Sequence, residues 1–243
     1  MTDGERLSLA LRMGDSALVL GHRLSELSGH APVLEEELAT ANVALDLVGQ
    51  ADLWLRLAAT LLDDGRDADA LAYLRDGPQF RNLLLVEQPN GDYGHTLMRQ
   101  FLFDCWHFYF LAELESGADA ACAEIAAKGA KEVRYHLERS SDWVIRLGDG
   151  TDESRVRMLT AVERLWPYTA EMFDLSAMFP AAAERVSQNW RASVAAVFAE
   201  ATLDVPEAGW AQRGGLDGRH TEHLGRMLAE MQFLQRAYPG AQW

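Results

Sequence analysis

Residues 95–115 read HTLMRQFLFDCWHFYFLAELE, and the spacing of their apolar side chains indicates the fold class. Leu97, Phe101, Phe108 and Leu111 recur at the spacing of one face of an α-helix, but position 104 of the same stripe is Asp. A carboxylate at an interior position needs a partner. The stretch therefore predicts a core helix that packs against other helices around a polar centre.

Similar periodicity elsewhere predicts an all-α chain. Turn signals at residues 28–32, 63–65, 116–117 and 148–151 separate the apolar runs. Core helices are expected at residues 6–26, 34–62, 95–115 and 120–147, and flanking helices at 152–173 (bent by Pro167), 186–201 and 224–234. A short helix at 68–75 should lead into a surface loop, and a Gly-rich loop should cover 206–218. We predict one domain, 1–243, with a four-helix bundle at about 6–147 and flanking helices at about 152–243.

Composition excludes several classes of function. The 243 residues include 37 acidic and 22 basic side chains, which gives a formal net charge of −15. Such a surface repels nucleic-acid phosphates and anionic membranes. No run reaches the roughly 18 apolar residues that a membrane span needs, and the two cysteines, Cys105 and Cys122, fall in apolar helical patterns. We expect buried free thiols and a cytoplasmic protein.

Five polar residues are candidates for a metal site in the bundle. They are Asp46, Asp104, His107, Glu132 and His136. Inward carboxylates and imidazoles on facing helices are typical of di-iron bundles, in which two helices each supply Glu-x-x-His. None of the predicted core helices contains Glu-x-x-His. The interpretation we favour is that these groups pair with each other or with Arg99 and Arg134; the alternative is a self-sufficient di-iron or di-manganese oxidase.

Two other features have simpler interpretations. His220, Glu222 and His223 suggest a metal patch, but Thr221 and Glu222 also have the pattern of a helix start, and capping is the preferred role. Trp190, Trp210 and Trp243 are candidate interface anchors, although a tryptophan on a helix face, such as Trp190, more often lies in the core.

Over essentially its whole length the chain resembles the C-subunit family of bacterial phenylacetyl-CoA epoxidases, a ferritin-like family. The resemblance rests on these segments: GHRLSELSGHAPVLEEELATANVALDLVGQA, LRDGPQFRNLLLVEQPNGDYGHT, RQFLFDCWHFYF, AAKGAKEVRYHLERSSDWVIRLGDGT, ATLDVP and HTEHLGRMLAEMQFLQRAYPGAQW. Long irregular segments such as RNLLLVEQPNGD are more specific than helical periodicity.

The resemblance implies a non-catalytic structural subunit without a cofactor of its own. In that family a related catalytic A subunit holds the di-iron centre, a small B subunit bridges the A and C pairs, and an iron-sulfur flavin reductase supplies electrons. The complex epoxidises a CoA-activated aromatic ring with dioxygen. Whether the isolated chain forms a homodimer stays open.

The resemblance also suggests where the metal ligands of the catalytic relative are missing. Its Glu-x-x-His on the second helix corresponds to Asp46-x-x-Gly49, and that on the fourth helix to Val133-x-x-His136. Asp104 matches the carboxylate of the third helix, while residues 16–19 (Ser-Ala-Leu-Val) stand where the first helix would supply Glu. We therefore expect this chain to bind no stable iron.

Overall fold

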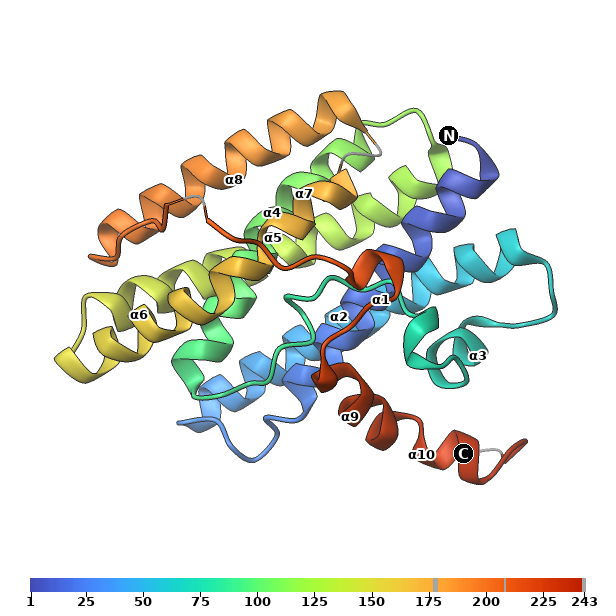
Figure 1. Ribbon diagram of the computed structural model, residues 1–243, viewed down its shortest axis with the longest axis horizontal. Coiled ribbons are helices and arrows are strands. Elements are labelled where there is room, and N and C mark those ends of the chain that lie inside the picture. The colour runs from blue at the N-terminus through green and yellow to red at the C-terminus, as the bar shows by residue number, and fades with distance from the viewer. Residues whose placement is uncertain (177–178, 208, 242–243) are drawn as a thin grey trace. The chain divides into compact units, whose positions relative to one another are not determined.

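The computed structural model describes residues 1–176, 179–207 and 209–241 (Figure 1). The fold is all-α and ferritin-like, and no strand occurs in these described ranges. The chain forms two compact units, one comprising residues 1–88 and 214–243 and the other residues 89–213. Each unit is built on one long helical hairpin. The predicted single domain with a four-helix core stays a prediction.

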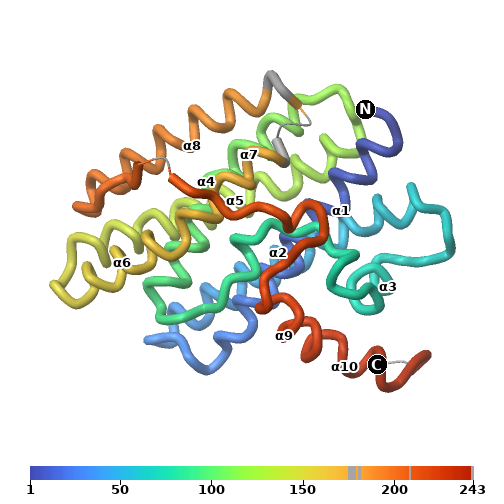
Figure 2. Tube along the Cα trace, viewed as in Figure 1, coloured from blue at the N-terminus to red at the C-terminus, as the bar shows by residue number. Residues whose placement is uncertain are grey.

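The first unit is built on helices α1 (Asp3–Ser25) and α2 (Leu34–Leu62), which pack against each other along their length (Figure 2). Thr2 caps α1 in a reciprocal capping box with Glu5. Three glutamates lie in the first turn of α2, where their negative charge at the positive end of the helix dipole stabilises the helix. The helix ends at Asp63, whose left-handed φ of 46° terminates the hydrogen-bond ladder.

Shorter elements complete this unit. They are α3 (Ala68–Tyr73), the 3₁₀ turns η1 (Gly77–Gln79) and η3 (Gly215–Asp217), α9 (Glu222–Met231) and α10 (Phe233–Ala237). Helix α3 packs on α2, and α9 contacts both α10 and η1. The C-terminal segment (residues 214–241) therefore lies against η1, the turn that follows α3.

The surface loop predicted after the short helix is wrong for residues 80–88. Phe80, Leu83 and Glu87 have no exposed surface, and every other residue of this irregular segment is buried or half-buried. A buried segment without regular structure must find partners for its backbone amides. Side chains of α1 supply them: Oδ2 of Asp15 accepts from the N–H of Arg81 at 2.7 Å, and Oγ of Ser16 accepts from that of Leu83 at 3.1 Å.

The second unit is built around α4 (Tyr93–Glu115), which is buried along most of its length. Helices α5 (Ala120–Gly148), α6 (Asp152–Leu165) and α8 (Pro180–Glu200) all pack against it. Nε1 of Trp190 on α8 donates to the carbonyl of Leu102 at 3.0 Å, which fixes α8 along α4. The interpretation of Trp190 as a core residue is confirmed.

The helix expected at 152–173 is interrupted rather than bent. Helix α6 stops at Leu165, a 3₁₀ turn, η2, covers Trp166–Tyr168, and α7 spans Ala170–Ser176. Pro167 removes a backbone donor and its ring clashes with the preceding turn, so the ladder is not maintained. The core helices follow their predicted boundaries within two residues at most termini, and none of the described helices is long and apolar enough to cross a membrane.

Candidate functional site

A buried polar cluster lies between α4 and α5 of the second unit. Asp104 and His107 come from α4, one turn apart, and His136 comes from α5; all three are buried. His136 acts electrostatically on both Asp104 and His107. The structure thus brings together three of the five candidate residues, on the two helices that the sequence indicated.

Asp104 is held by neutral donors. Nε2 of Gln100 donates to Oδ1 at 2.6 Å, and Oγ of Ser140 on α5 donates to Oδ2 at 2.9 Å. Burial raises the pKa of Asp104 to about 6, although His136 and these hydrogen bonds pull it in the opposite direction. Burial therefore disfavours the charged form relative to a solvated carboxylate, but a pKa of about 6 leaves Asp104 mostly ionised at neutral pH.

His107 lies in an aromatic environment. Its ring centroid is 5.0 Å from that of Phe103, and it stacks on Trp106 at 6.1 Å. Burial and the charge of His136 lower the pKa of His107 to about 3, so the imidazole is neutral at physiological pH. Its Nδ1 has no hydrogen-bond partner among the described residues. An orphaned buried nitrogen of this kind is unusual in a structural core.

Three arginines of the second unit bear on the expected pairing of the cluster, which stays a prediction. Nη2 of Arg99 donates to Asn90 at 2.6 Å, and the guanidinium of Arg134 lies over the ring of Phe108 at 5.6 Å. The arginine whose charge lowers the pKa of Asp104 is Arg139, which also donates to the hydroxyl of Tyr93 at 3.0 Å. Arg139 lies one residue before Ser140, and therefore close to the helix position that contacts Asp104.

The remaining candidates are less buried. Glu132 lies on α5, one turn before His136, and is half-buried. Asp46 is half-buried on α2, in the other unit, and Gly49 is exposed. Ser16 and the following residues of α1 are buried, and the Ser16 hydroxyl is already engaged with the backbone of Leu83.

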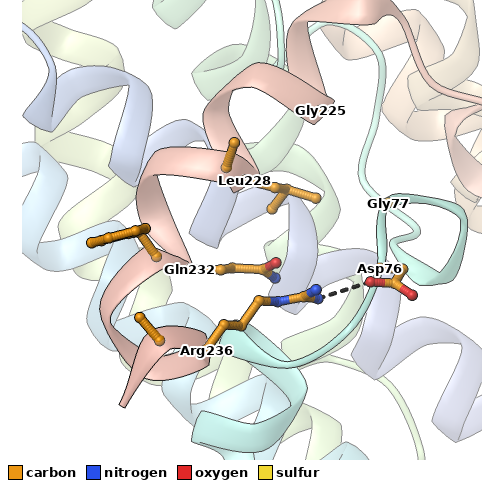
Figure 3. A pocket seen from close by; sticks show the side chains of 9 residues that line it. Asp76, Gly77, Gly225, Leu228, Gln232 and Arg236 are labelled. Carbon is orange, nitrogen blue, oxygen red and sulfur yellow. Dashed lines mark hydrogen bonds and ion pairs between the residues drawn. The ribbon is translucent and has the colours of Figure 1, made fainter. Parts of the chain in front are cut away.

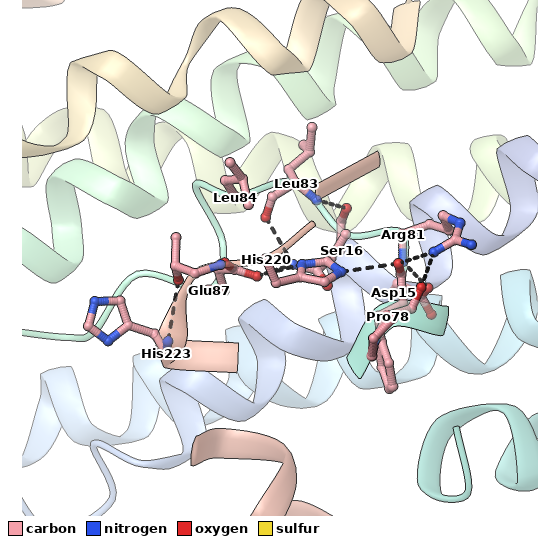
Figure 4. Close-up of polar contacts among 12 residues, drawn as sticks. Asp15, Ser16, Pro78, Arg81, Leu83, Leu84, Glu87, His220 and His223 are labelled. Atoms are coloured by element: carbon pink, nitrogen blue, oxygen red, sulfur yellow. Dashed lines mark hydrogen bonds and ion pairs between the residues drawn. The ribbon is translucent and has the colours of Figure 1, made fainter. Parts of the chain in front are cut away.

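A second buried polar cluster, in the first unit, was not anticipated from the sequence (Figure 4). Asp15 on α1 forms an ion pair with Arg75, and both side chains are almost fully buried. Further along, Oε2 of Glu87 lies 2.9 Å from Nδ1 of His220, and Oε1 accepts from the N–H of Thr221 at 2.6 Å. The only sequence signal was a pair of acids, Asp15 and Glu87, within otherwise apolar stretches.

His220 and Thr221 are therefore structural residues. Nε2 of His220 lies 3.1 Å from the carbonyl of Phe80, so both ring nitrogens are engaged within the unit. Thr221 is the N-cap of α9 and accepts from the N–H of His223. The capping role predicted for this stretch is confirmed.

An open pocket of about 510 Å³ lies beside α9 and α10 (Figure 3). Leu228, Phe233 and Gln232 form its helical wall, and Arg236 spans it to reach Asp76 at 2.9 Å. Arg236 also donates to backbone carbonyls, including that of Arg75 at 2.9 Å. The charged groups of this pocket pair with each other, so it has the character of a packing groove rather than a reaction site.

The predicted free thiols are confirmed. Cys105 and Cys122 are buried and form no disulfide. Burial raises the pKa of the Cys105 thiol, whose Sγ lies 3.9 Å from the carbonyl of Trp190. A thiol in this environment is not a nucleophile.

Comparison with known proteins identifies the family of this chain. The family described as "Phenylacetic acid catabolic protein" matches residues 2–243. The chain belongs to this family. It is also 49% identical, over 241 residues, to a protein of Escherichia coli (strain K12) that is named as the C subunit of 1,2-phenylacetyl-CoA epoxidase. The match covers 96% of this chain and 97% of that relative, so it spans both units.

The donor side chains of this phenylacetic acid catabolic protein differ from the ligand set of a di-iron centre. Among the residues that the structure describes, no group of three or more His, Cys, Asp and Glu side chains has an arrangement that could hold a metal ion. Asp104 is occupied by Gln100 and Ser140. A carboxylate-bridged di-iron centre takes about four carboxylates and two imidazoles. The residues present do not fit that group.

Proposed function

We propose that this chain is the non-catalytic C subunit of a phenylacetyl-CoA epoxidase, and that it pairs with and stabilises the subunit that holds the di-iron centre. Membership of the family and 49% identity to a relative named as a C subunit support the pathway and the subunit type. The structural role is our inference from the polar cluster of the second unit.

One observation carries this proposal: at the position that matches the third-helix carboxylate of the catalytic relative, this chain has Asp104, whose hydrogen-bond donors are uncharged. Gln100 and Ser140 each donate to it, and burial raises its pKa to about 6. A di-iron site requires several ionised carboxylates to balance the charge of two cations. The buried cluster between α4 and α5 instead contains one fully buried carboxylate, Asp104, in direct contact with uncharged donors.

The proposed division of labour places the chemistry in neighbouring polypeptides. The catalytic A subunit would hold the di-iron centre and bind the CoA thioester of the aromatic acid. A small B subunit would bridge pairs of A and C subunits, and an iron-sulfur flavin reductase would deliver electrons. This chain would contribute a rigid helical surface that keeps the catalytic subunit folded and soluble.

Two measurements test the proposal. Purified chain incubated anaerobically with ferrous iron and then desalted should retain well below one iron per chain. Mixed with the catalytic A subunit of a phenylacetyl-CoA epoxidase, it should elute with that subunit as one complex and raise its melting temperature. A stoichiometric di-iron absorption spectrum from this chain alone, or the absence of any complex, would overturn the proposal.

The alternative, a self-sufficient di-iron or di-manganese oxidase, has one observation in its favour. Nδ1 of His107 lacks a hydrogen-bond partner among the described residues, so this nitrogen is available to coordinate a metal ion. Iron or manganese binding that is lost in His107→Ala and retained in His30→Ala, at an exposed histidine, would favour this alternative.

A further inference from the structure

Helix α2 carries an apolar stripe that the described part of the chain leaves uncovered. Leu34, Leu38 and Leu45 have exposed fractions of 69%, 58% and 69%. Ala41 is also exposed, and Val48 is half-buried. Single exposed leucines are ordinary, but several gathered on one stripe of one helix mark an interaction surface.

The spacing of this stripe specifies what kind of element covers it. Positions 34, 38, 41, 45 and 48 alternate steps of four and three residues, which is the repeat of a coiled-coil seam. Such a seam accepts the side chains of a second helix between its own. We call these five residues the α2 seam. At ~1.5 Å per residue it is about 21 Å long.

The seam has a defined end and a hollow beside it. Further along the same face, Arg56 forms an ion pair with Asp52 at 2.7 Å, so the apolar surface stops at Val48. A groove of about 240 Å³ opens along the seam, with Ala41, Leu45 and Val48 in one wall and Leu24 and Leu27 in the other. An incoming side chain therefore has a place to insert between α2 and the end of α1.

The charge around the seam identifies the partner's chemistry. Glu35, Glu37 and Asp46 border it, and no Lys or Arg occurs between Arg23 and Arg56. A second copy of this chain packed here about a two-fold axis would bring acid against acid, and the net charge of −15 adds to that repulsion. A helix with basic flanks meets no such penalty.

We propose that the α2 seam docks an amphipathic helix of the catalytic subunit, one with apolar side chains at the same spacing and Lys or Arg along its flanks. This inference rests on the proposed function and names the surface through which that function operates. The leucines supply the contact area, and Glu35 with its acidic neighbours selects the partner and accelerates association.

The test compares two pairs of exposed apolar residues. Leu38→Ser with Leu45→Ser removes the centre of the seam. Val156→Ser with Leu159→Ser is the matched control on α6, where the exposed fractions are 61% and 41%. The probe is the purified catalytic A subunit, titrated calorimetrically into each full-length variant after a melting curve has shown that the variant is folded. We expect the Kd to rise about tenfold or more for the seam variant and to stay within about twofold of the wild type for the control.

A charge-reversal arm tests the selectivity. Glu35→Lys should raise the Kd and weaken its dependence on salt concentration, because one attractive interaction becomes repulsive.

Each contrary outcome has a distinct meaning. If the wild type and the seam variant bind the catalytic subunit equally well, the seam proposal is overturned and the proposed function stands. If the wild type does not bind, the proposed function fails and the seam proposal fails with it. If the seam substitutions convert a homodimer to a monomer in sedimentation without changing the Kd for the catalytic subunit, the occupant is a second copy and the proposal is wrong.

Discussion

The carboxylate of Glu87 lies 2.9 Å from Nδ1 of His220, although 133 residues separate them in the sequence. The same carboxylate accepts from the N–H of Thr221 at 2.6 Å and from Nδ2 of Asn82 at 3.0 Å, and its side chain has no exposed surface. One buried acid thus fastens the C-terminal segment of the first unit to the irregular segment at residues 80–88.

Glu87→Ala should therefore destabilise the protein by about 3 to 5 kcal/mol, the range for removing one partner of a buried charged network. The substitution removes the carboxylate contacted by Nδ1 of His220 and by the N–H of Thr221, whereas Nδ2 of Asn82 keeps the carbonyl of Leu83 as an acceptor. Urea unfolding measures the loss, and limited proteolysis should show early cleavage within residues 219–241. The control is Glu153→Ala, which removes an exposed pair with Arg157 on α6 and should cost no more than about 0.5 kcal/mol. Equal losses in the two variants would contradict the fastening role.

Asp104→Asn should stabilise the protein above pH 6. The pKa of Asp104 is raised from 3.8 to about 6 by burial, so the folded state keeps a proton that the unfolded state releases. Its contribution to stability therefore falls as the pH rises from about 4 to 6, by on the order of 3 kcal/mol if the whole shift is expressed. The introduced amide also has an acceptor within reach, because Oε1 of Gln100 has no partner among the described residues.

The measurement is the urea midpoint at a series of pH values between 4 and 8. Asp142→Asn, at an exposed position of α5, is the control and should leave the pH profile unchanged. A midpoint for Asp104→Asn at pH 8 below that of the wild type would show that the carboxylate is stabilised in its charged form.

The contribution of His107 to stability should fall as the pH drops, whereas that of Asp104 falls as the pH rises. Its pKa is lowered from 6.5 to about 3, so the unfolded state takes up a proton that the folded state refuses. Stability from this group is full above pH 6.5 and falls as the pH drops, by about 2 kcal/mol at pH 5. His107→Phe fills the same aromatic site without a titrating group and should lose less stability between pH 7 and pH 5 than the wild type.

Thermal melting at pH 7 and pH 5 measures the difference. His30→Phe is the control, because His30 is exposed in the turn between α1 and α2. This variant should melt with the same pH dependence as the wild type. If His107→Phe and the wild type lose stability in parallel, the acid sensitivity belongs to other groups.

Local patterns predicted the helices well and the polar networks poorly. The boundaries of α2 and α5 follow from turn residues and apolar spacing, which are properties of neighbouring residues. The same spacing placed Asp104, His107 and His136 in one cluster. It did not indicate that the charge of Arg139 acts on Asp104, because that interaction depends on how α4 and α5 rotate against each other.

The segment at residues 80–88 shows a second limit of local patterns. Its lack of periodicity predicted a surface loop, because a buried irregular backbone is usually unsatisfied. Asp15 and Ser16 satisfy it from a distance of more than sixty residues, and Glu87 is satisfied from the C-terminal segment. The exposed leucines of α2 have the same origin: periodicity shows that a face is apolar but not what covers it.

Two glycines in the C-terminal segment provide a sharp test of this long-range packing. A Cβ at Gly215 would lie 2.2 Å from the carbonyl oxygen of Asn82 and 3.1 Å from the backbone nitrogen of Leu84, so neither obstacle is a flexible side chain. Gly215→Ala should therefore displace η3 from the irregular segment and cost about 2 kcal/mol or more. By contrast, Gly225 lies within α9, and a methyl group added there would meet nothing within 4 Å, so Gly225→Ala should stabilise by up to about 1 kcal/mol, since alanine favours the helix. Urea midpoints of the two variants should therefore move in opposite directions, and a harmless Gly215→Ala would mean that η3 does not pack on residues 82–84.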